Sequence, residues 1–463
     1  MSDGVLSVIP AREGSKGIPR KNLRELGDHP LVGHAIRTSK KSSLVNHIAL
    51  TTDSQEIAQI GRRYGVDTIV DRPTRLATDE VPLAPVIEHA FENVSQEYQH
   101  VLCFQPTVPL ISVSSIDRGI EEGRNENTDT VVFVKNSTHI YWRDGENGYE
   151  PVANDRKNRQ QLDPIYEEIG VFLSEKDVIE QTRRVGDSPM FYEVESEEGV
   201  DIDTYADWIL AESQLQSKQV LYRLIGNSNA GTGHVFRGIT LADRIFEHDI
   251  LFAVMSTEKL AIEELDRANY NYHIFDDEQS FIDYVRSSTP DVVVNDILDT
   301  SAEYIESLQR DTPRVVNFED LGSGINQADA VINALYEYSN PPENHYFGFE
   351  YFCLRDEFMY ASPRKEIPSV DRIMISFGGT DENNLTQKTL RALSDIDLEV
   401  HLDVVLGLGY TKQESLASIT STYRSNIDID INQNIKSMGK HMEQADLIIT
   451  SNGRTLYEAA GLN

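Results

Sequence analysis

The chain has 463 residues, a length that predicts two to four domains. A hydrophobic fraction of 39% is enough to build folded cores, which argues against extensive disorder. The 76 acidic residues outnumber the 42 Lys and Arg and give a net charge of −34, which disfavours a nucleic-acid partner. Acidic residues distributed this evenly along a chain are typical of proteins from a halophilic cytoplasm, so we expect folding and activity to depend on salt concentration.

Targeting and redox signals are weak in this sequence. The two cysteines, Cys103 and Cys353, form no metal-binding spacing and no disulfide framework. The N-terminus turns from an acidic start into a short apolar stretch and is not a signal peptide. Apolar runs are far shorter than the ~20 residues that span a bilayer. The sequence therefore predicts a soluble, cytoplasmic protein with no membrane partner.

The first half alternates short apolar runs with helical periods. The expected strands are 5–10, 47–52, 67–70, 101–104 and 130–135, and the expected helices are 31–39, 55–64, 85–94 and 115–123. Strands that alternate with helices predict a mostly parallel sheet with helices on both faces. Ligands bind such sheets at the carboxyl ends of the strands.

Residues 211–219 are polar, lack a strand pattern and predict a linker. The alternation restarts with strand 220–225, helix 234–245 and strand 250–254, and again with strand 372–377 after a sub-boundary at 363–368. We expect an α/β protein with three domains, 1–215, 220–365 and 370–463. The last domain ends on a strand at 445–450 and a helix start at 454–460, so we expect it to be truncated.

The loop after the first strand gathers positive charge in an acidic chain. Its four cations are Arg12, Lys16, Arg20 and Lys21. Glycines in the loop let backbone N–H groups converge on phosphate oxygens, and the cations bind the same oxygens. The loop lacks the Walker spacing. A solvated basic turn is the alternative, but the position after the first strand and the local reversal of charge favour a phosphate loop.

A second charged segment contains Asp201 and Asp203. In an extended segment these two side chains project to one side, while Ile202 points into the core. Two neighbouring carboxylates repel unless a cation joins them, and Mg²⁺ with phosphate oxygens is the common solution. The alternative is a pair of caps for the helix expected at 204–213. Beside a phosphate loop, the pair predicts metal-assisted nucleotidyl transfer.

Residues 5–212 resemble the cytidylyltransferases that activate sialic acid and related nine-carbon sugar acids. Five motifs carry the resemblance in order: IPAREGSKGIPRKN, TTDS at Asp53, FQPTVPL at Gln105, RQQL from Arg159, and VDIDT. The resemblance implies a Rossmann-like nucleotidyltransferase sheet. It also implies a site with three kinds of contact. CTP is bound by Arg12, Ser15, Lys16, Lys21 and Asn22, the sugar acid is contacted by Gln105 and Arg159, and Mg²⁺ is held by Asp201 and Asp203. The residues implied to be catalytic are Lys16, Lys21 and Asp203. The alternatives are a loop cap for Gln105 and a surface ion pair for Arg159.

The departures from that family fall on the sugar side. Segment 167–170 reads Glu-Glu-Ile-Gly where bacterial enzymes often have Arg-x-Asn-Gly. Trp142 stands where some members have a lysine that faces the sugar. The nucleotide is therefore better specified than the sugar acid. The implied reaction is an in-line attack of the sugar's anomeric hydroxyl on the α-phosphorus of CTP, with pyrophosphate leaving.

The second half places three functional candidates after glycine turns. His234 begins a helix after Gly231 and Gly233, where the helix dipole favours the neutral imidazole that accepts a proton. Gly379 and Thr380 precede a helix whose free N–H groups suit a diphosphate. Glu458 follows another turn and can accept both ribose hydroxyls. The alternatives are a capping or packed histidine, an ordinary turn and a solvated glutamate.

Residues 220–463 resemble the UDP-sugar hydrolases of the pseudaminic-acid pathway, which are relatives of two-lobed glycosyltransferases of the B type. The matching segments are GTGHVFR, NFED, YFCLRDEF, FGGTDENNLT and the last segment with Glu458. The resemblance implies that His234 activates a water that releases UDP from a 2,4-diacetamido-trideoxy hexose. Gly379 and Thr380 would lie at the diphosphate and Glu458 at the ribose. The sequence departs from the pattern directly after Asp296.

The two resemblances predict a bifunctional enzyme, a CMP-nonulosonate synthetase followed by a UDP-sugar hydrolase of the same pathway. A glycosyltransferase-like pair of lobes and a catalytically inactive nucleotide-binding module are the alternatives for the second half. The expected small-molecule partners are CTP, a nine-carbon sugar acid and a UDP-sugar, with Mg²⁺ as cofactor. The oligomeric state is left open, with a homodimer among the options.

Overall fold

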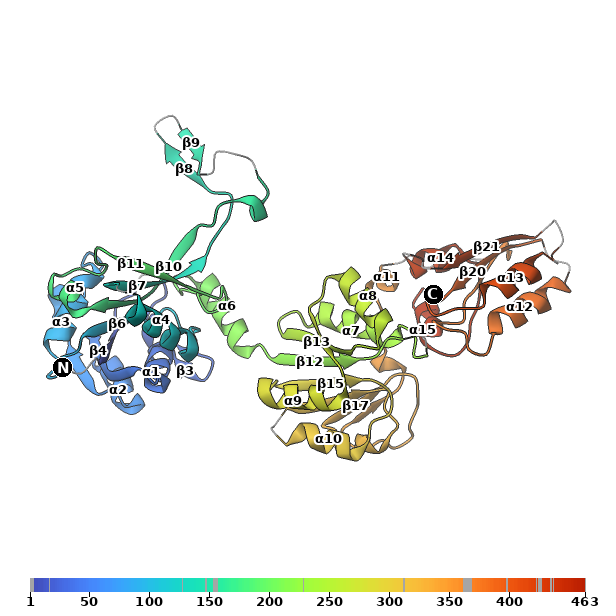
Figure 1. Cartoon of the computed structure of the whole chain (residues 1–463), viewed down its shortest axis with the longest axis horizontal. Helices are drawn as coiled ribbons and strands as arrows, with labels where there is room; N and C mark the ends of the chain where they lie inside the picture. The colour runs from blue at the N-terminus through green and yellow to red at the C-terminus, as the bar shows by residue number, and fades with distance from the viewer. Residues whose placement is uncertain are drawn as a thin grey trace. The chain divides into compact units, whose positions relative to one another are not determined.

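The computed structural model divides the chain into two compact units, Met1–Gln216 and Ser217–Asn463, called unit 1 and unit 2 (Figure 1). The structure describes residues 4–15, 17–126, 128–145, 148–152, 157–227, 229–310, 313–360, 369–396, 399–421, 423, 427–433, 435 and 437–462. No helix among these residues is long and apolar enough to cross a bilayer.

Unit 1 is built on a seven-stranded sheet in the order β11-β7-β10-β6-β1-β4-β5. Its strands are β1 (Val5–Pro10), β4 (Val45–Thr52), β5 (Thr68–Asp71), β6 (His100–Phe104), β7 (Thr130–Asn136), β10 (Tyr166–Glu175) and β11 (Pro189–Val194). All neighbours are parallel except β10, which runs antiparallel to both β6 and β7. The mostly parallel sheet is therefore confirmed, and β10 and β11 are additions that the sequence did not reveal.

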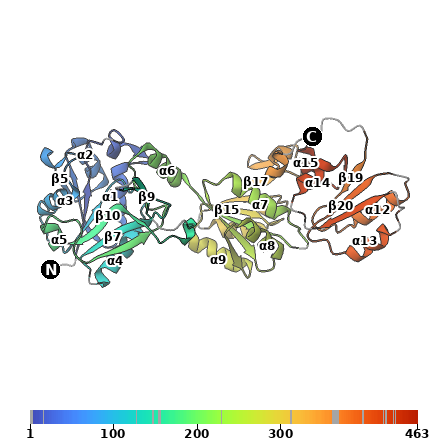
Figure 2. The same cartoon turned by 90° about the horizontal axis from the view of Figure 1, so that it is seen from above.

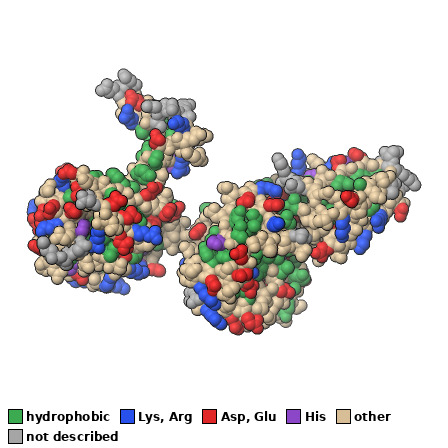
Figure 3. Space-filling view, in the orientation of Figure 1, with side chains coloured by type: hydrophobic (Ala, Val, Ile, Leu, Met, Phe, Trp, Pro, Cys, Tyr) green, Lys and Arg blue, Asp and Glu red, His purple; other side chains and the backbone are tan. Residues whose placement is uncertain are grey.

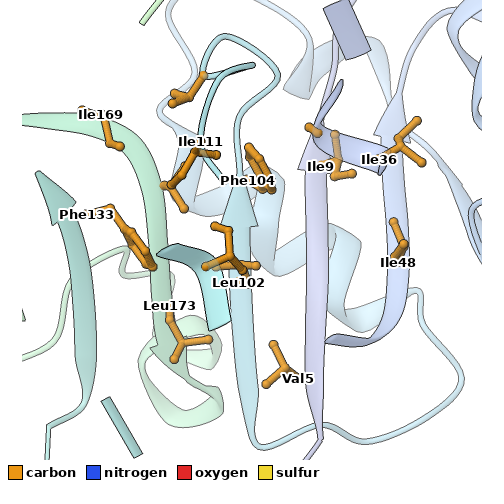
Figure 4. Close-up of a cluster of buried hydrophobic side chains, with 14 of the residues drawn as sticks. Val5, Ile9, Ile36, Ile48, Leu102, Phe104, Ile111, Phe133, Ile169 and Leu173 are labelled. Carbon is orange, nitrogen blue, oxygen red and sulfur yellow. The ribbon is translucent and has the colours of Figure 1, made fainter. Parts of the chain in front are cut away.

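Apolar side chains of alternate strand residues fill both faces of this sheet. On β1, Val5 and Ile9 join one buried cluster, whereas Leu6 and Val8 join the other. Figure 4 shows part of the first cluster, to which Ile36 contributes from a helix. The covering helices of the unit are α1 (Leu31–Lys41), α2 (Gln55–Tyr64), α3 (Leu83–Glu92), α4 (Val113–Asn125), α5 (Lys176–Glu180) and α6 (Tyr205–Gln216).

A hairpin arm stands out from the sheet of unit 1 (Figure 1). It carries the antiparallel strands β8 (Trp142–Gly145) and β9 (Gly148–Pro151), and Figure 3 shows hydrophobic side chains along it. A second, shorter hairpin pairs β2 (Glu25–Leu26) with β3 (His29–Pro30). Single 3-10 turns are η1 (Lys21–Leu23), η2 (Thr74–Leu76) and η3 (Arg159–Gln161).

The linker expected at 211–219 is wrong over most of its length. Helix α6 continues to Gln216, and strand β12 begins at Gln219. Trp208 and Ala211 of this helix are buried against Ile202 and its apolar neighbours. The polar residues of the segment therefore form the exposed face of a packed helix, a pattern that resembles a linker when only composition is considered.

Unit 2 contains two parallel sheets. The larger has the order β14-β13-β12-β15-β16-β17-β18, and the smaller has the order β21-β20-β19-β22. Strands of the larger sheet are β12 (Gln219–Leu224), β13 (Asp249–Met255), β14 (Tyr272–Phe275), β15 (Val292–Asp296), β16 (Arg314–Phe318), β17 (Ala330–Asn333) and β18 (His345–Phe347). Strands of the smaller sheet are β19 (Arg372–Ile375), β20 (His401–Leu406), β21 (Asp428–Gln433) and β22 (Leu447–Ile449).

Helices cover both sheets of unit 2. The larger sheet carries α7 (Gly233–Arg244), α8 (Lys259–Ala268), α9 (Glu278–Ser288), α10 (Ala302–Gln309) and η4 (Ser323–Asn326), followed along the chain by η5 (Phe349–Tyr351) and α11 (Asp356–Met359). Around the smaller sheet lie α12 (Leu385–Ser394), α13 (Gln413–Thr420), α14 (Met438–Gln444) and α15 (Arg454–Ala460), as Figure 2 shows from above. The expected restart of the α/β alternation is thus present. The sub-boundary at 363–368 lies outside the described residues.

Candidate active sites

In unit 1 the loop after β1 closes against the segment that contains the aspartate pair. A Cβ atom at Gly17 would lie 2.2 Å from the carbonyl oxygen of Asp203, so only glycine permits this approach. Lys21 Nζ donates to the Ile202 carbonyl at 2.5 Å and lies 3.1 Å from Asp203 Oδ1. Two motifs far apart in the sequence are therefore joined. Lys16 lies outside the described residues.

The aspartate pair has an environment suited to a cation. Burial raises the pKa of Asp201 above its ordinary value, against the opposing effect of a hydrogen bond with Thr107. Asp201 Oδ1 is buried and accepts no hydrogen bond from the described part of the chain. Asp203 is 77% exposed at its side chain. One enclosed and one accessible carboxylate are oxygen ligands of the kind that Mg²⁺ takes with phosphate and water.

Among the described residues neither aspartate caps α6. Thr204 Oγ1 accepts from the Asp207 N–H at 3.4 Å, and the Asp207 carboxylate accepts in return from the N–H groups of Thr204 at 2.7 Å and Asp203 at 3.1 Å. Ile202 is fully buried, as the alternation predicted. No group of three or more His, Cys, Asp or Glu able to hold a metal occurs among the described residues. A metal bound here would thus take its remaining ligands from the substrate and water.

The other cations of the loop have acidic partners. Arg12 pairs with Asp79, and its backbone carbonyl accepts from Asn22 Nδ2 at 2.9 Å. Arg20 pairs with Glu56, and both side chains are more than half exposed. Exposed pairs of this kind contribute little stability and can rearrange around a stronger anion. Ser15 is half-buried in the same loop.

Gln105 lies at the carboxyl end of β6 against a bulge in β10. Gly170 has φ +73°, and a Cβ there would lie 2.7 Å from Gln105 Nε2. The Gln105 N–H donates to the Gly170 carbonyl at 3.2 Å. Of the two carboxylates in this unusual segment, Glu167 pairs with Lys135 and Glu168 with Arg184. Segment 167–170, where the sequence differs from the family pattern, therefore lies next to Gln105, and its two glutamates form ion pairs.

Arg159 and Trp142 lie apart from Gln105. Arg159 is exposed in η3, and its Nε donates to the Thr138 carbonyl at 2.9 Å; with the residues that the structure describes it forms no ion pair. Trp142 begins β8 on the arm and is 53% exposed. Within the described residues, no recorded contact joins Arg159 to Gln105. The structure gathers the nucleotide side of the predicted site but not its sugar side.

Unit 2 contains a cavity of about 850 Å³, a volume typical of pockets for small molecules and cofactors. The sequence candidates on its wall are His234, Gly379 and Glu458, together with Gly231 and Gly233. Thr380 is not among the described residues that line it. The cavity thus collects the glycine turns that follow β12 and β19 and the one that precedes α15.

His234 is held by a buried acid that the sequence analysis did not include in the site. Its Nδ1 contacts Asp296 Oδ1 at the end of β15. The other carboxylate oxygen, Asp296 Oδ2, accepts from Tyr222 Oη at 3.0 Å and from Arg237 Nε at 2.7 Å. Burial opposes ionisation, but Arg237 and His234 overcome it and hold the pKa of Asp296 well below its ordinary value. With Nδ1 engaged, Nε2 is the ring nitrogen left for a ligand.

Arg237 links this pair to a second acid on the cavity wall. Its Nη1 contacts Glu319, whose backbone has a left-handed φ of 51°. Non-glycine residues rarely adopt this conformation, and it is found disproportionately at functional sites. Asp296 could have been suspected from its position, because it ends the strand next to β12 and faces the same sheet edge. Glu319 lies in the NFED segment, but the sequence does not show that it contacts Arg237.

Glu458 is buried, so its interpretation as a solvated residue is wrong. It pairs with Arg355 at 3.0 Å. Arg355 also pairs with Glu357 at 2.8 Å and lies 4.8 Å from the ring centres of Phe236 and Phe358. The arginine therefore fixes one carboxylate oxygen of Glu458 and leaves the other for a ligand.

The expectation of free N–H groups at the start of α12 is also wrong. The buried Asp381 accepts from Leu385 N at 2.7 Å and from Thr386 N at 2.9 Å. A carboxylate at this position repels a diphosphate and occupies the donors that would bind it. Gly378 and Gly379 still line the cavity, with φ +77° at Gly378.

Comparison with known proteins identifies the domain in unit 1. Residues 6–146 match the family described as Cytidylyltransferase, so unit 1 contains a cytidylyltransferase domain. The chain is 29% identical over 219 residues to N-acylneuraminate cytidylyltransferase A of Danio rerio, covering 46% of this chain and 50% of that protein. It is 26% identical over 234 residues to the CMP-N,N'-diacetyllegionaminic acid synthase of Legionella pneumophila, covering 46% and 97%.

The chain spans about half the length of the first curated relatives that it matches. Among solved structures, Acinetobacter baumannii MurG is 16% identical, with a TM-score of 0.41, and the alignment covers 53% of this chain and 76% of that one.

Proposed function

We propose that unit 1 transfers CMP from CTP to a nonulosonic acid of the sialic, pseudaminic or legionaminic type and releases pyrophosphate. The family match and the names of the relatives, which are a cytidylyltransferase and a CMP-sugar synthase, support this proposal. The observation that carries it is the closure of the loop after β1 on the aspartate pair through Lys21 and Asp203. This closure puts a cation and two carboxylates at one carboxyl edge of the sheet, where ligands of α/β proteins bind.

We assign the following roles to the residues of unit 1. Lys21, fixed by the Ile202 carbonyl, faces the phosphates and offsets charge as pyrophosphate leaves. Arg12, Ser15, Lys16 and Asn22 complete the CTP site, and Gln105 and Arg159 orient the sugar acid. Asp201 and Asp203 would hold Mg²⁺, which neutralises charge on the triphosphate when bound. The sugar hydroxyl attacks the α-phosphorus in line, so no covalent intermediate is needed.

The test is pyrophosphate release from CTP and Mg²⁺ with a panel of nonulosonic acids. Lys21→Ala and Asp203→Asn should each lower the rate by about 100-fold or more. Lys176→Gln is the control, because it removes one cation from α5 at the opposite end of β6 and should leave the rate unchanged. Unaltered rates in both site variants, or no turnover with any acid, would reject the proposal.

We further propose that unit 2 hydrolyses a UDP-sugar of the same pathway, a 2,4-diacetamido-trideoxy hexose derivative. The observation that favours it is His234, held by Asp296 on the wall of a cavity large enough for a nucleotide sugar. His234 Nε2 takes a proton from water, the water oxygen bonds to the anomeric carbon, and the bond from that carbon to the UDP oxygen breaks. One condensation step would separate this product from the substrate of unit 1.

Turnover of the UDP-sugar with water alone distinguishes this activity from the alternatives. A glycosyltransferase-like pair of lobes would require an acceptor sugar, and an inactive nucleotide-binding module would bind UDP without turnover. His234→Ala should abolish UDP release while UDP binding persists. Unchanged UDP release in this variant would show that His234 is not the base.

A further inference from the structure

The cavity of unit 2 is lined by charges that mostly compensate one another. Arg267 donates to Glu264 at 2.7 Å and 2.9 Å, and Arg355 pairs with Glu458 at 3.0 Å. Arg454 also lines the cavity. Across the described ranges, no carboxylate forms an ion pair with it. Its recorded contacts are a hydrogen bond from Nη2 to the Cys353 carbonyl at 3.0 Å and the Phe352 ring at 4.8 Å.

These contacts hold Arg454 at the point where the glycine turns meet. A Cβ at Gly233 would lie 3.0 Å from Arg454 Cδ, so the arginine stem passes directly over the start of α7. A Cβ at Gly379 would lie 3.2 Å from the Cα of Gly231, so these two turns are also in close approach. The fixed guanidinium therefore stands beside the positive end of a twelve-residue helix.

The electrostatics of this position are incompletely balanced. Burial and the charge of Arg237 lower the pKa of Arg454, and the charges of Glu458, Glu319 and Asp296 offset this only in part. An enclosed cation without a paired carboxylate is unfavourable unless a ligand supplies the counter-charge. The start of α12 offers a diphosphate no alternative anchor, because Asp381 already accepts from the N–H groups of Leu385 and Thr386.

We propose that Arg454 binds the diphosphate of the nucleotide and makes the cavity select nucleoside diphosphates over monophosphates and uncharged nucleosides. This inference rests on the function proposed for unit 2. A guanidinium presents several N–H donors in one plane, which matches adjacent phosphate oxygens. Arg454 donates to one backbone carbonyl, so donors remain for the ligand.

The test is calorimetric titration of the full chain with UDP, UMP and uridine. Arg454→Gln should weaken UDP binding by about 10-fold to 100-fold, the loss expected for a charge-assisted hydrogen bond, and leave uridine within about twofold. The preference for UDP over UMP should shrink in parallel. Arg454→Lys, which keeps a positive charge, should recover part of the UDP affinity.

Two controls locate the effect. Arg314→Gln removes one exposed cation from the start of β16, at the edge of the larger sheet opposite to the turn after β12, and should not change UDP binding. Lys21→Ala should also leave UDP binding intact, which excludes unit 1 as its source. Wild-type UDP affinity in Arg454→Gln, or a Lys variant no better than the Gln variant, would overturn the role of Arg454. If wild-type protein itself shows no heat with UDP, the function proposed for unit 2 fails and the inference fails with it.

Discussion

Gly17→Ala tests whether the contact between the loop after β1 and the aspartate segment is required for nucleotidyl transfer. The added Cβ would lie 2.2 Å from the Asp203 carbonyl oxygen, whereas ordinary contacts begin at 3.4 Å. The two segments would have to separate by about 1.2 Å, because a backbone oxygen cannot rotate away as a side chain can. That separation would move Lys21 away from its two partners, the Ile202 carbonyl and Asp203.

Forced separation of packed segments costs about 1 to 3 kcal/mol. Displacement of reacting groups by about 1 Å lowers a rate by about 100-fold. We therefore expect Gly17→Ala to lower the melting temperature of unit 1 and to lower kcat/KM for CTP by about 100-fold. Initial rates of pyrophosphate release and differential scanning calorimetry measure the two effects.

Gly14→Ala is a matched control from the same loop. Its added Cβ would have no atom within 4 Å, so the same chemical change should leave both stability and kcat/KM near the wild-type values. Equal kcat/KM in the Gly17 and Gly14 variants would refute the reasoning, because closure of the loop on the aspartates would then not matter for activity.

Three other predictions follow from buried charge and from composition. Because burial raises the pKa of Asp201, ionisation of this carboxyl group destabilises the fold progressively as pH rises through that pKa. Asp201→Asn should therefore raise the melting temperature, and the increase should be largest above that pKa. The same variant should abolish turnover. Equal melting curves at all pH values would contradict this. Asp296→Asn removes the charge that faces His234 and Arg237. It should lower the free energy of unfolding of unit 2, measured by denaturant titration, by about 3 to 5 kcal/mol and leave that of unit 1 unchanged. A chain with a net charge of −34 should melt at a higher temperature in molar KCl than in dilute buffer, and a flat response to salt would contradict the halophilic interpretation.

The parts of the fold that the sequence predicted are those with strong local periodicity. Strands β1 and β6 are short apolar runs bounded by polar loops, and both are present as expected. Strand β10 escaped detection because its first three residues, Tyr166–Glu168, include two acids and are not buried, unlike the six residues that follow. Helix α6 was cut short because its last turn is polar, and only tertiary packing shows that it continues.

The candidate sites were predicted where one motif supplies the chemistry by itself. The glycine-rich loop with Lys21 and the pair Asp201 and Asp203 could be identified separately, and their contact is confirmed by the structure. The network around His234 was not assigned, because Asp296, which contacts His234, and Glu319, which contacts Arg237, come from other strand ends and join it only in the folded sheet. The helix start after Gly379 was misjudged for the same reason, since the Asp381 side chain folds back onto it.

The two units place their cations differently, and this difference bears on how each would bind an anion. In unit 1, Arg12 and Arg20 pair with acids that are exposed at the surface, so these pairs are weak and a polyphosphate can displace the acids. In unit 2, Arg237 is locked to the fully buried Asp296, and breaking such a pair costs several kcal/mol. The pairs of Arg12 and Arg20 can therefore rearrange around a ligand, whereas the pair of Arg237 with Asp296 cannot. Binding of CTP should consequently weaken more steeply with salt than binding of UDP, because exposed charges are screened and enclosed ones are not.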